Sequence, residues 1–303
     1  MKDQTLEITK DQSPNAAVLS KALDYAPFLS TAIAYYKSTK GQHNPIKSPT
    51  QSQYETFPSG YTLVANILMK DFFGLFDPVY FGFIASEDAN PTSIVVAIRG
   101  TQGIPEWVDD FQTDLTHYPF ALNAGNVETG FLELYKSLDL WTPGGKSKVI
   151  NLAETASNDS TSLVNLNNYK QVTMIGHSLG SSLVTLYGLH MAANHKNKKV
   201  IIYTLASPAT GDQHFVDYYN SVITETYRIY NKRDLVPKSL QFLNHNYVQV
   251  TDGIELDPEN YPLNPADAGC MHVLPTYIYL MIGEASQTDI LGACLYTHKH
   301  ILS

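Results

Sequence analysis

The chain lacks an excess of basic residues, and it lacks long apolar runs. Its 303 residues hold 20 lysines and arginines against 29 aspartates and glutamates, for a formal net charge of −9. The longest basic cluster is "HKNKK" at 195–199, so we expect no nucleic-acid partner and little attraction to anionic lipid surfaces. No apolar run approaches the roughly 18 residues of a membrane span, so no transmembrane segment is expected. With 44% hydrophobic and 16% charged residues, the composition is that of an ordinary globular protein.

The chain also has few cysteines and no apolar core at its N-terminus. Cys270 and Cys294 are too few for a disulfide scaffold, and their spacing leaves open whether they pair. The opening stretch "MKDQTLEITKDQSPN" is polar, unlike a secretory signal. We therefore expect a cytoplasmic protein, one exported without a classical signal, or one whose signal has been removed. None of these features determines the oligomeric state.

Strand-like and helix-like segments alternate along the chain. The predicted strands are 79–86, 93–100, 171–176, 199–206, 225–231 and 246–251. The predicted helices are 14–37 with a break or kink at Pro27, 63–69, 131–140, 179–193, 214–222 and 272–282. This alternation predicts an α/β fold with a mostly parallel central sheet and helices on both faces. We expect a single domain over residues 1–303, with 142–170 as a surface excursion.

A Gly-X-Ser-X-Gly pentapeptide joins the strand at 171–176 to the helix at 179–193. Its sequence is Gly176-His177-Ser178-Leu179-Gly180. Such a sharp reversal strains the central residue, while the flanking glycines let strand and helix approach closely. Ser178 would then project at the amino end of a helix, where backbone N–H groups stabilise an anion. This pattern indicates a nucleophile, although the pentapeptide also recurs by chance in loops.

A nucleophilic serine needs a base, a carboxylate that orients the base, and donors for the oxyanion. Asp234 follows the strand at 225–231, at the position of the acid. The alternative is a solvated aspartate that pairs with the neighbouring Lys232 or Arg233. Among the later histidines, His272 begins an apolar helix and is the preferred base. The alternatives are His245, close to the next predicted strand, and the terminal His298 and His300, a pair that more often belongs to a tail than to a metal site.

Two backbone segments offer donors for the oxyanion. The N–H of Leu179, directly after the serine, supplies one. The loop "RGTQG" after the strand at 93–100 supplies the other, because Gly100 permits close approach and Thr101 has both an N–H and a hydroxyl. We therefore expect Thr101 and Leu179 to form the oxyanion hole.

These motifs together resemble the class 3 (filamentous-fungal type) lipase family of the α/β-hydrolase fold. The stretches that carry the resemblance, in the family's order and over about residues 79 to 282, are "IRGTQGIPEWVDDFQTDL", "ETGFLELY", "VTMIGHSLG", "LASPATGD", "NKRDLVP" and "CMHVLPTYIYLM". The resemblance implies the same roles for Ser178, Asp234, His272, Thr101 and Leu179. Two positions depart from the family pattern. Ser181 stands where a second glycine is usual, and Val127-Glu128-Thr129 stands where a Val-His pair usually precedes the Gly-Phe pair, here Gly130-Phe131.

The resemblance also implies a lid helix over about residues 102–115. An apolar stripe falls there at helical spacing, formed by Ile104, Trp107, Val108, Phe111 and Leu115, beside acidic residues. A helix that simply faces the core has the same pattern. A lid differs in that it moves away at a lipid interface, which is where we expect the lipid or ester substrate to be met.

The predicted function is serine-dependent hydrolysis of carboxylic esters of lipids, with triacylglycerol as the leading substrate. Phospholipase A1 and feruloyl-type esterase activities are close alternatives, because the same machinery serves all three. A non-catalytic lipid-binding protein of the same fold is the alternative of another class. Neither a cofactor nor a metal ion is required by the chemistry, and none is expected.

Overall fold

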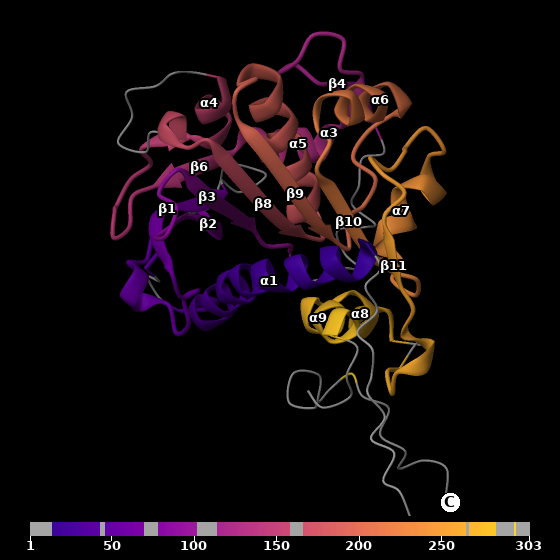
Figure 1. Ribbon diagram of the computed structural model, residues 1–303, viewed down its shortest axis with the longest axis horizontal. Helices are drawn as coiled ribbons and strands as arrows, with labels where there is room; N and C mark the ends of the chain where they lie inside the picture. The colour runs from indigo at the N-terminus through magenta and orange to yellow at the C-terminus, as the bar shows by residue number, and fades with distance from the viewer. Residues whose placement is uncertain are drawn as a thin grey trace, which may run out of the picture.

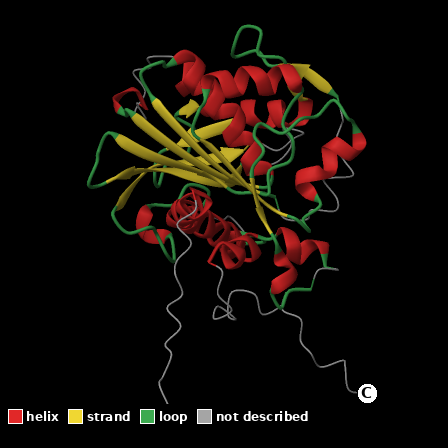
Figure 2. Cartoon of the chain, turned by 45° about the vertical axis from the view of Figure 1, so that its right-hand side comes forward, coloured by secondary structure: helices red, strands yellow, loops and turns green. Residues whose placement is uncertain are grey.

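A large sheet runs through the middle of the protein, and helices cover both of its faces (Figure 1). The computed structural model describes residues 14–42, 46–69, 78–101, 114–157, 166–264 and 267–282, together with Cys294. Figure 2, turned from the first view, shows the twist of the strands and the helices on either side. The predicted α/β architecture is confirmed. That the whole chain is one domain stays a prediction.

The strands of the central sheet, among the described residues, follow the order β11-β10-β9-β8-β3-β2-β1-β6-β7. Their bounds are β1 Tyr61–Met69, β2 Val79–Glu87, β3 Ser93–Ile98, β6 Leu138–Trp141, β7 Ile150–Asn151, β8 Gln171–His177, β9 Lys199–Leu205, β10 Thr226–Asn231 and β11 Ile254–Leu256. The neighbours β3, β8, β9, β10 and β11 pair in parallel, while β2, β1, β6 and β7 extend the sheet with antiparallel pairs. A separate hairpin pairs β4 (Leu115–His117) with β5 (Asn126–Glu128).

Each face of the sheet packs on its own group of helices. One face is covered by α3 (Thr129–Lys136), α4 (Leu152–Ser157), α5 (Leu179–Asn194) and α6 (Gln213–Val222). The other face is covered by α1 (Pro14–Thr39), α8 (Ala268–His272) and α9 (Leu274–Ile282), while α7 (Val236–Leu243) follows β10. Short 3-10 turns lie at Gln51–Gln53, Leu166–Asn168 and Pro258–Asn260.

The central strands and helix are buried on all sides, which explains their continuous apolar sequences. Every residue of β3 is buried, as is every residue of α5 from Leu179 to Met191. Strands of a sheet covered on both faces read as unbroken apolar runs, and a helix that is apolar all round belongs in a core. No helix in the described part of the chain is both long enough and apolar enough to cross a bilayer.

Several predicted elements are wrong in type or extent. Residues 61–69 form strand β1 because they pair with both β2 and β6, where a helix was predicted for 63–69. The helix predicted over 131–140 ends at Lys136, and the chain then enters β6. The strand predicted over 246–251 is absent from this described region, where Val248 makes only an isolated bridge to Gly211.

Helix α1 is continuous through Pro27, so of the predicted break or kink the break does not occur, while the kink stays a prediction. His272 ends α8 and does not begin the following helix, which starts at Leu274. The turn "EDANPT" joins β2 to β3, and the two strands pair in antiparallel as a hairpin. Of the predicted lid, residues 102–113 lie outside the described residues, including Ile104, Trp107, Val108 and Phe111. Leu115 begins strand β4, so the predicted helix does not reach it.

Candidate active site

Ser178 lies at the tip of the turn between β8 and α5, in a strained backbone conformation. Its φ is 58° and its ψ is −128°, values that residues with side chains rarely adopt. A Cβ atom on Gly176 would lie 2.4 Å from the carbonyl oxygen of Gly180, and one on Gly180 would lie 2.1 Å from that of Ile98. The two glycines are therefore needed because strand, turn and helix touch through their backbones.

His272 lies directly against the serine. Its Nε2 is 2.8 Å from the Oγ of Ser178, and both residues are almost fully buried. The histidine is the last residue of α8, and Cys270 in the same helix forms a disulfide with Cys294. The pairing that the sequence left open is thus present two residues before the candidate base.

Asp234 completes a chain of hydrogen bonds with His272 and Ser178. Its Oδ2 is 2.8 Å from the Nδ1 of His272, while its Oδ1 accepts a 3.0 Å hydrogen bond from the backbone N–H of Val236. Asp234 is 1% exposed. The alternative of a solvated ion pair is wrong, because Lys232 and Arg233 are engaged with other carboxylates: Lys232 with Asp257 and both with Glu259.

Three further residues hold this arrangement, and the sequence analysis missed all of them. The hydroxyl of Tyr277 donates to Oδ2 of Asp234 at 2.7 Å and accepts from the backbone N–H of Asn231 at 3.0 Å. The side-chain amide of Asn231 donates to the carbonyl of Met271, and Nε2 of His177 lies 2.8 Å from the carbonyl of His272. Because the partners lie 40 or more residues apart in the chain, no local pattern in one sequence marks them.

Burial sets the protonation of His177 and of Tyr277. Burial, together with the neighbouring His272 ring, lowers the pKa of His177 to about 3, so its imidazole is neutral at physiological pH. A neutral ring can donate from Nε2 to the carbonyl of His272. Burial and the nearby Asp234 carboxylate raise the pKa of Tyr277 well above its ordinary value. Tyr277 therefore remains a hydroxyl that can donate to Asp234.

The loop after β3 approaches the nucleophile closely. A Cβ atom on Gly100 would lie 2.8 Å from Cβ of Ser178 and 2.9 Å from the carbonyl oxygen of His177. Next to it, the Oγ1 of Thr101 is buried and has no hydrogen-bond partner among the described residues. Leu179 opens α5, where the N–H groups of the first turn lack partners within the helix. The structure thus places Gly100, the residue before Thr101, against the serine and Leu179 directly after it; the oxyanion role of Thr101 and Leu179 stays a prediction.

A pocket of about 230 Å³ opens beside these groups. Its described lining includes Gly100, Thr101, His177 and His272 from the site. Helix α1 and the start of α9 supply the remainder of its apolar wall through Ile33, Tyr36, Val273, Leu274 and Pro275. An apolar pocket with a few convergent polar groups is the usual form of a site for a small molecule or a lipid chain.

The two departures from the family pattern fit the fold. Ser181 is fully buried and its hydroxyl donates to the carbonyl of Leu205 at 2.9 Å, so helix packing accommodates it. Glu128 caps α3 by accepting from the backbone N–H of Phe131. Burial raises the pKa of Glu128 to about 7. The backbone N–H of Ser181 donates to the carbonyl of Ser178 at 2.8 Å, while the side chains of Ser181 and Glu128 bond to Leu205 and Phe131, not to the serine, histidine or aspartate side chains.

The other candidate histidines lie elsewhere. His245 is exposed in the loop after α7, whereas His298 and His300 fall outside the described residues. Over the described ranges, no group of three or more histidine, cysteine, aspartate and glutamate side chains is placed to hold a metal ion.

Part of the chain matches a known protein family. Residues 95–243 match the family described as lipase (class 3). Similar curated proteins include phospholipase A1-II 3 of Oryza sativa subsp. indica, 28% identical over 71% of this chain and 54% of that protein. Another is the chloroplastic phospholipase A1-Ialpha2 of Arabidopsis thaliana, 30% identical over 62% of this chain and 44% of that protein. The chain therefore spans about half the length of these relatives.

Solved lipase structures share the fold. The lipase from Rhizopus microsporus var. chinensis superposes with a TM-score of 0.55 at 22% identity, covering 86% of each chain. The Rhizomucor miehei lipase in its propeptide complex gives a TM-score of 0.54 at 21% identity, over 78% of this chain and 68% of that one. The α/β-hydrolase fold is thereby confirmed. Residues 95–243, which contain Ser178 and Asp234, belong to the class 3 lipase family.

Proposed function

We propose that the protein is a serine-dependent carboxylic ester hydrolase that acts on acyl esters of lipids. One observation carries the proposal: an unbroken, buried series of hydrogen bonds joins Ser178, His272 and Asp234 at 2.8 Å each. This is the relay by which a serine hydroxyl is activated for attack on a carbonyl carbon. The reaction needs no cofactor.

The proposed mechanism proceeds through an acyl-enzyme. Nε2 of His272 accepts the proton of Ser178 as Oγ attacks the ester carbonyl, and the resulting oxyanion accepts hydrogen bonds from Leu179 N–H and from Thr101. The protonated His272 then gives its proton to the departing alcohol. Water, deprotonated by the same ring, attacks the acyl group and frees the carboxylic acid. Asp234 stays ionised and holds the imidazole in the required tautomer.

The surroundings of the site support a lipid as the substrate. The pocket wall is largely apolar, and three large apolar side chains at the two ends of α7, the helix that follows Asp234, face solvent: Leu235 is 62% exposed, Phe242 72% and Leu243 56%. Exposed apolar patches of this kind occur where proteins meet membranes or other apolar surfaces. A lipid-water interface is therefore the proposed place of action.

Triacylglycerol is the substrate predicted from the sequence, and phospholipase A1 activity is the second candidate. The names of the plant relatives favour the second, since both are phospholipases A1. The feruloyl-type esterase alternative has no such support. A non-catalytic lipid-binding role would leave the hydrogen-bonded set of serine, histidine and aspartate without a use.

Initial rates on a matched series of esters test the proposal. We expect hydrolysis of p-nitrophenyl esters with acyl chains from acetate to palmitate, together with activity on a triacylglycerol emulsion or on phospholipid micelles. The matched control is Ser178→Ala. Absence of hydrolysis of every ester by the folded protein would refute the proposal, as would equal rates for the Ser178→Ala protein.

We further propose that the segment containing Ile104, Trp107, Val108 and Phe111 acts as a lid. The proposal rests on the helical spacing of these apolar residues directly after Thr101. A lipid surface removes the cost of exposing apolar area, about 25 cal/mol per Å², and so favours an open state. The rate should rise steeply when an ester passes its solubility limit, and Ile104→Ser with Phe111→Ser should weaken that rise. A single smooth saturation curve would contradict the lid.

For the location of the protein, we propose an oxidising compartment. The disulfide between Cys270 and Cys294 supports this, because disulfides persist outside the reducing cytosol. Alkylation of protein isolated under thiol-trapping conditions should modify neither cysteine, and complete modification of both would contradict the proposal.

A further inference from the structure

The pocket beside His272 has an unbalanced charge. Two cations, Lys37 and Arg99, line it, and none of its described lining residues is acidic. This contrasts with the chain as a whole, whose formal net charge is −9. A cavity with apolar walls strengthens the field of such charges, because little water is present to screen them.

Arg99 is a buried cation with no carboxylate partner among the described residues. Only 2% of its surface is exposed. Its guanidinium donates to the carbonyls of Tyr80 and Gly100, and it lies between the ring of Tyr36, 3.5 Å from the centroid, and that of Phe81 at 4.2 Å. Burial lowers the pKa of Arg99 to about 10, so the group keeps its charge at neutral pH. These contacts fix the cation but do not neutralise it.

Lys37 is the flexible cation of the pocket. It lies in the last turn of α1, is exposed, and forms no ion pair in the part of the chain that the structure describes. Several other lysines do have carboxylate partners: Lys136 pairs with Glu133, Lys199 with Glu225 and Lys232 with Asp257. A lysine near a helix C-terminus also interacts favourably with the helix dipole, but that role does not require a place at the mouth of a pocket.

We propose that this pocket receives the phosphate of a glycerophospholipid substrate, with Lys37 as the residue that contacts the phosphate. The inference rests on the proposed ester hydrolysis and specifies its substrate class. A triacylglycerol has no group that uses the two cations, whereas the phosphodiester of a phospholipid is an anion attached to the same glycerol as the esters. Lys37 Nζ donates to the phosphate oxygens, and Arg99, held in the pocket wall by its own contacts, adds positive potential without a direct contact to the phosphate.

Two soluble esters that differ only in the headgroup test the proposal. Dihexanoylphosphatidylcholine and dihexanoylglycerol share their acyl chains, and below the micellar concentration neither presents an interface. The measured quantity is the ratio of kcat/KM for the phospholipid to kcat/KM for the diacylglycerol. Lys37→Met should lower this ratio by roughly three- to tenfold, as expected for a charge-assisted hydrogen bond at a partly exposed site. Lys37→Glu should lower it further, and Lys37→Arg should restore most of it.

Lys40→Met is the matched control, because Lys40 is also exposed and follows α1 directly but does not line the pocket. We expect its ratio to equal that of the wild type. An unchanged ratio in Lys37→Met, with both lipids hydrolysed, would overturn the phosphate site and leave the ester hydrolase standing. An equal fall of the ratio in Lys37→Met and Lys40→Met would also overturn the phosphate site, since it would mean that any nearby lysine attracts the phospholipid. Failure to hydrolyse the phospholipid, with the diacylglycerol hydrolysed, would overturn the phosphate site alone. Failure on both lipids and on every p-nitrophenyl ester would overturn both proposals.

Discussion

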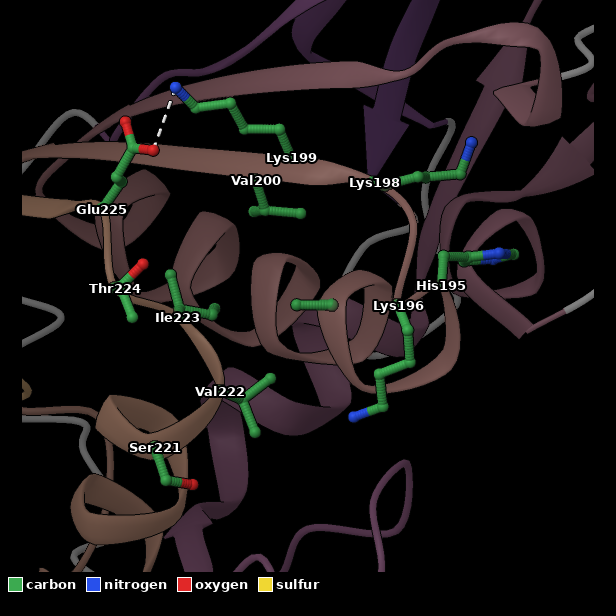
Figure 3. A pocket seen from close by; sticks show the side chains of 11 residues that line it. His195, Lys196, Lys198, Lys199, Val200, Ser221, Val222, Ile223, Thr224 and Glu225 are labelled. Carbon is green, nitrogen blue, oxygen red and sulfur yellow. Dashed lines mark ion pairs between the residues drawn. The ribbon is translucent and has the colours of Figure 1, made fainter.

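Two pockets of similar size lie at opposite ends of the parallel strands, which we call the carboxyl edge and the amino edge of the sheet. Their polar groups are arranged differently. The one at the carboxyl edge, about 230 Å³, adjoins Ser178 through His272 and Thr101. The one at the amino edge, about 270 Å³, lies between the starts of β9 and β10 and the ends of α5 and α6. Lys196, Lys198 and Lys199 line this second pocket, and Figure 3 shows their amino groups pointing in three different directions.

Two of the three lysines at the amino edge, Lys198 and Lys199, have structural roles. Lys199 forms an ion pair with Glu225 at 2.9 Å, and Lys198 donates to the carbonyls of Leu166 and Tyr169. The carboxyl ends of two helices also meet there, and their dipoles favour nearby cations. The comparison teaches that neither volume nor the number of charges identifies a site. What distinguishes the carboxyl edge is that its polar groups converge on one serine.

The largest expected effect comes from removing a side chain of the hydrogen-bonded series that ends on Ser178. Asp234→Asn and His272→Ala should each lower kcat by several orders of magnitude, because members of a serine triad act as a unit. Steady-state kinetics on a soluble p-nitrophenyl ester measures this. His245→Ala, at an exposed histidine away from the site, is the control and should keep wild-type kcat. Loss of activity in His245→Ala, with full activity in His272→Ala, would show that the base is misassigned.

A smaller effect is expected from the hydroxyl of Thr101. Thr101→Val keeps the shape and the backbone N–H but removes the buried, unpartnered Oγ1, and should lower kcat by roughly ten- to a thousandfold. Thr173→Val removes a hydroxyl in β8 that is likewise buried and has no partner among the described residues, so it controls for the loss of a buried hydroxyl away from the oxyanion. Equal kcat values in the two variants would reject the side-chain role of Thr101.

Glu128 tests what burial does to a carboxyl that lines neither pocket. Burial raises its pKa to about 7 from an ordinary 4.5. The neutral carboxyl of Glu128 therefore makes its full contribution to the free energy of unfolding below pH 4.5, and this contribution is lost as pH rises through 7. Glu128→Gln should remove this loss, amounting to about 3 kcal/mol at alkaline pH. Urea unfolding across this range measures it.

The exposed Glu133 is the control for Glu128, since it pairs with Lys136 at the surface. Glu133→Gln should have the same pH dependence of stability as the wild type. Parallel curves for the wild type and Glu128→Gln would mean that Glu128 is ionised in the folded protein without cost.

The smallest effects are expected at the amino edge. Lys196→Met and Lys199→Met should leave kcat and KM unchanged for every ester, and should alter the free energy of unfolding by less than about 1 kcal/mol, the usual range for exposed ion pairs. Thermal unfolding and the two-lipid assay measure both quantities. A selective loss of phospholipid hydrolysis in Lys196→Met would contradict the distinction between the two edges.

Local patterns predicted the parts of the fold that depend on local chemistry. The strand-turn-helix around Ser178 was predictable because a glycine pair, an apolar run and a buried helix lie within a few turns of each other. Strand β1 was not, because its apolar residues have no clear period and its pairing with β2 and β6 decides its structure. The ends of α3 and α8 depended on similar tertiary contacts.

The same distinction holds at the site. Ser178, His272 and Asp234 could be found because each follows a recognisable segment in a fixed chain order, and the structure brings them together. Tyr277, Asn231 and the pocket cations could not be found, since their roles arise from contacts between elements far apart in the chain. Their catalytic and binding roles remain proposals for experiment.

The most direct test of the central claim is covalent labelling of the nucleophile. An alkyl fluorophosphonate should attach to one residue, Ser178, because within the described ranges it is the only hydroxyl hydrogen bonded to the candidate base His272. Peptide mass analysis after stoichiometric reaction identifies the modified residue. The account predicts a label on Ser178, none in Ser178→Ala, and full labelling in the control Ser182→Ala, whose hydroxyl is buried in α5. A label on any other serine, or labelling of Ser178→Ala at the wild-type rate, would contradict it.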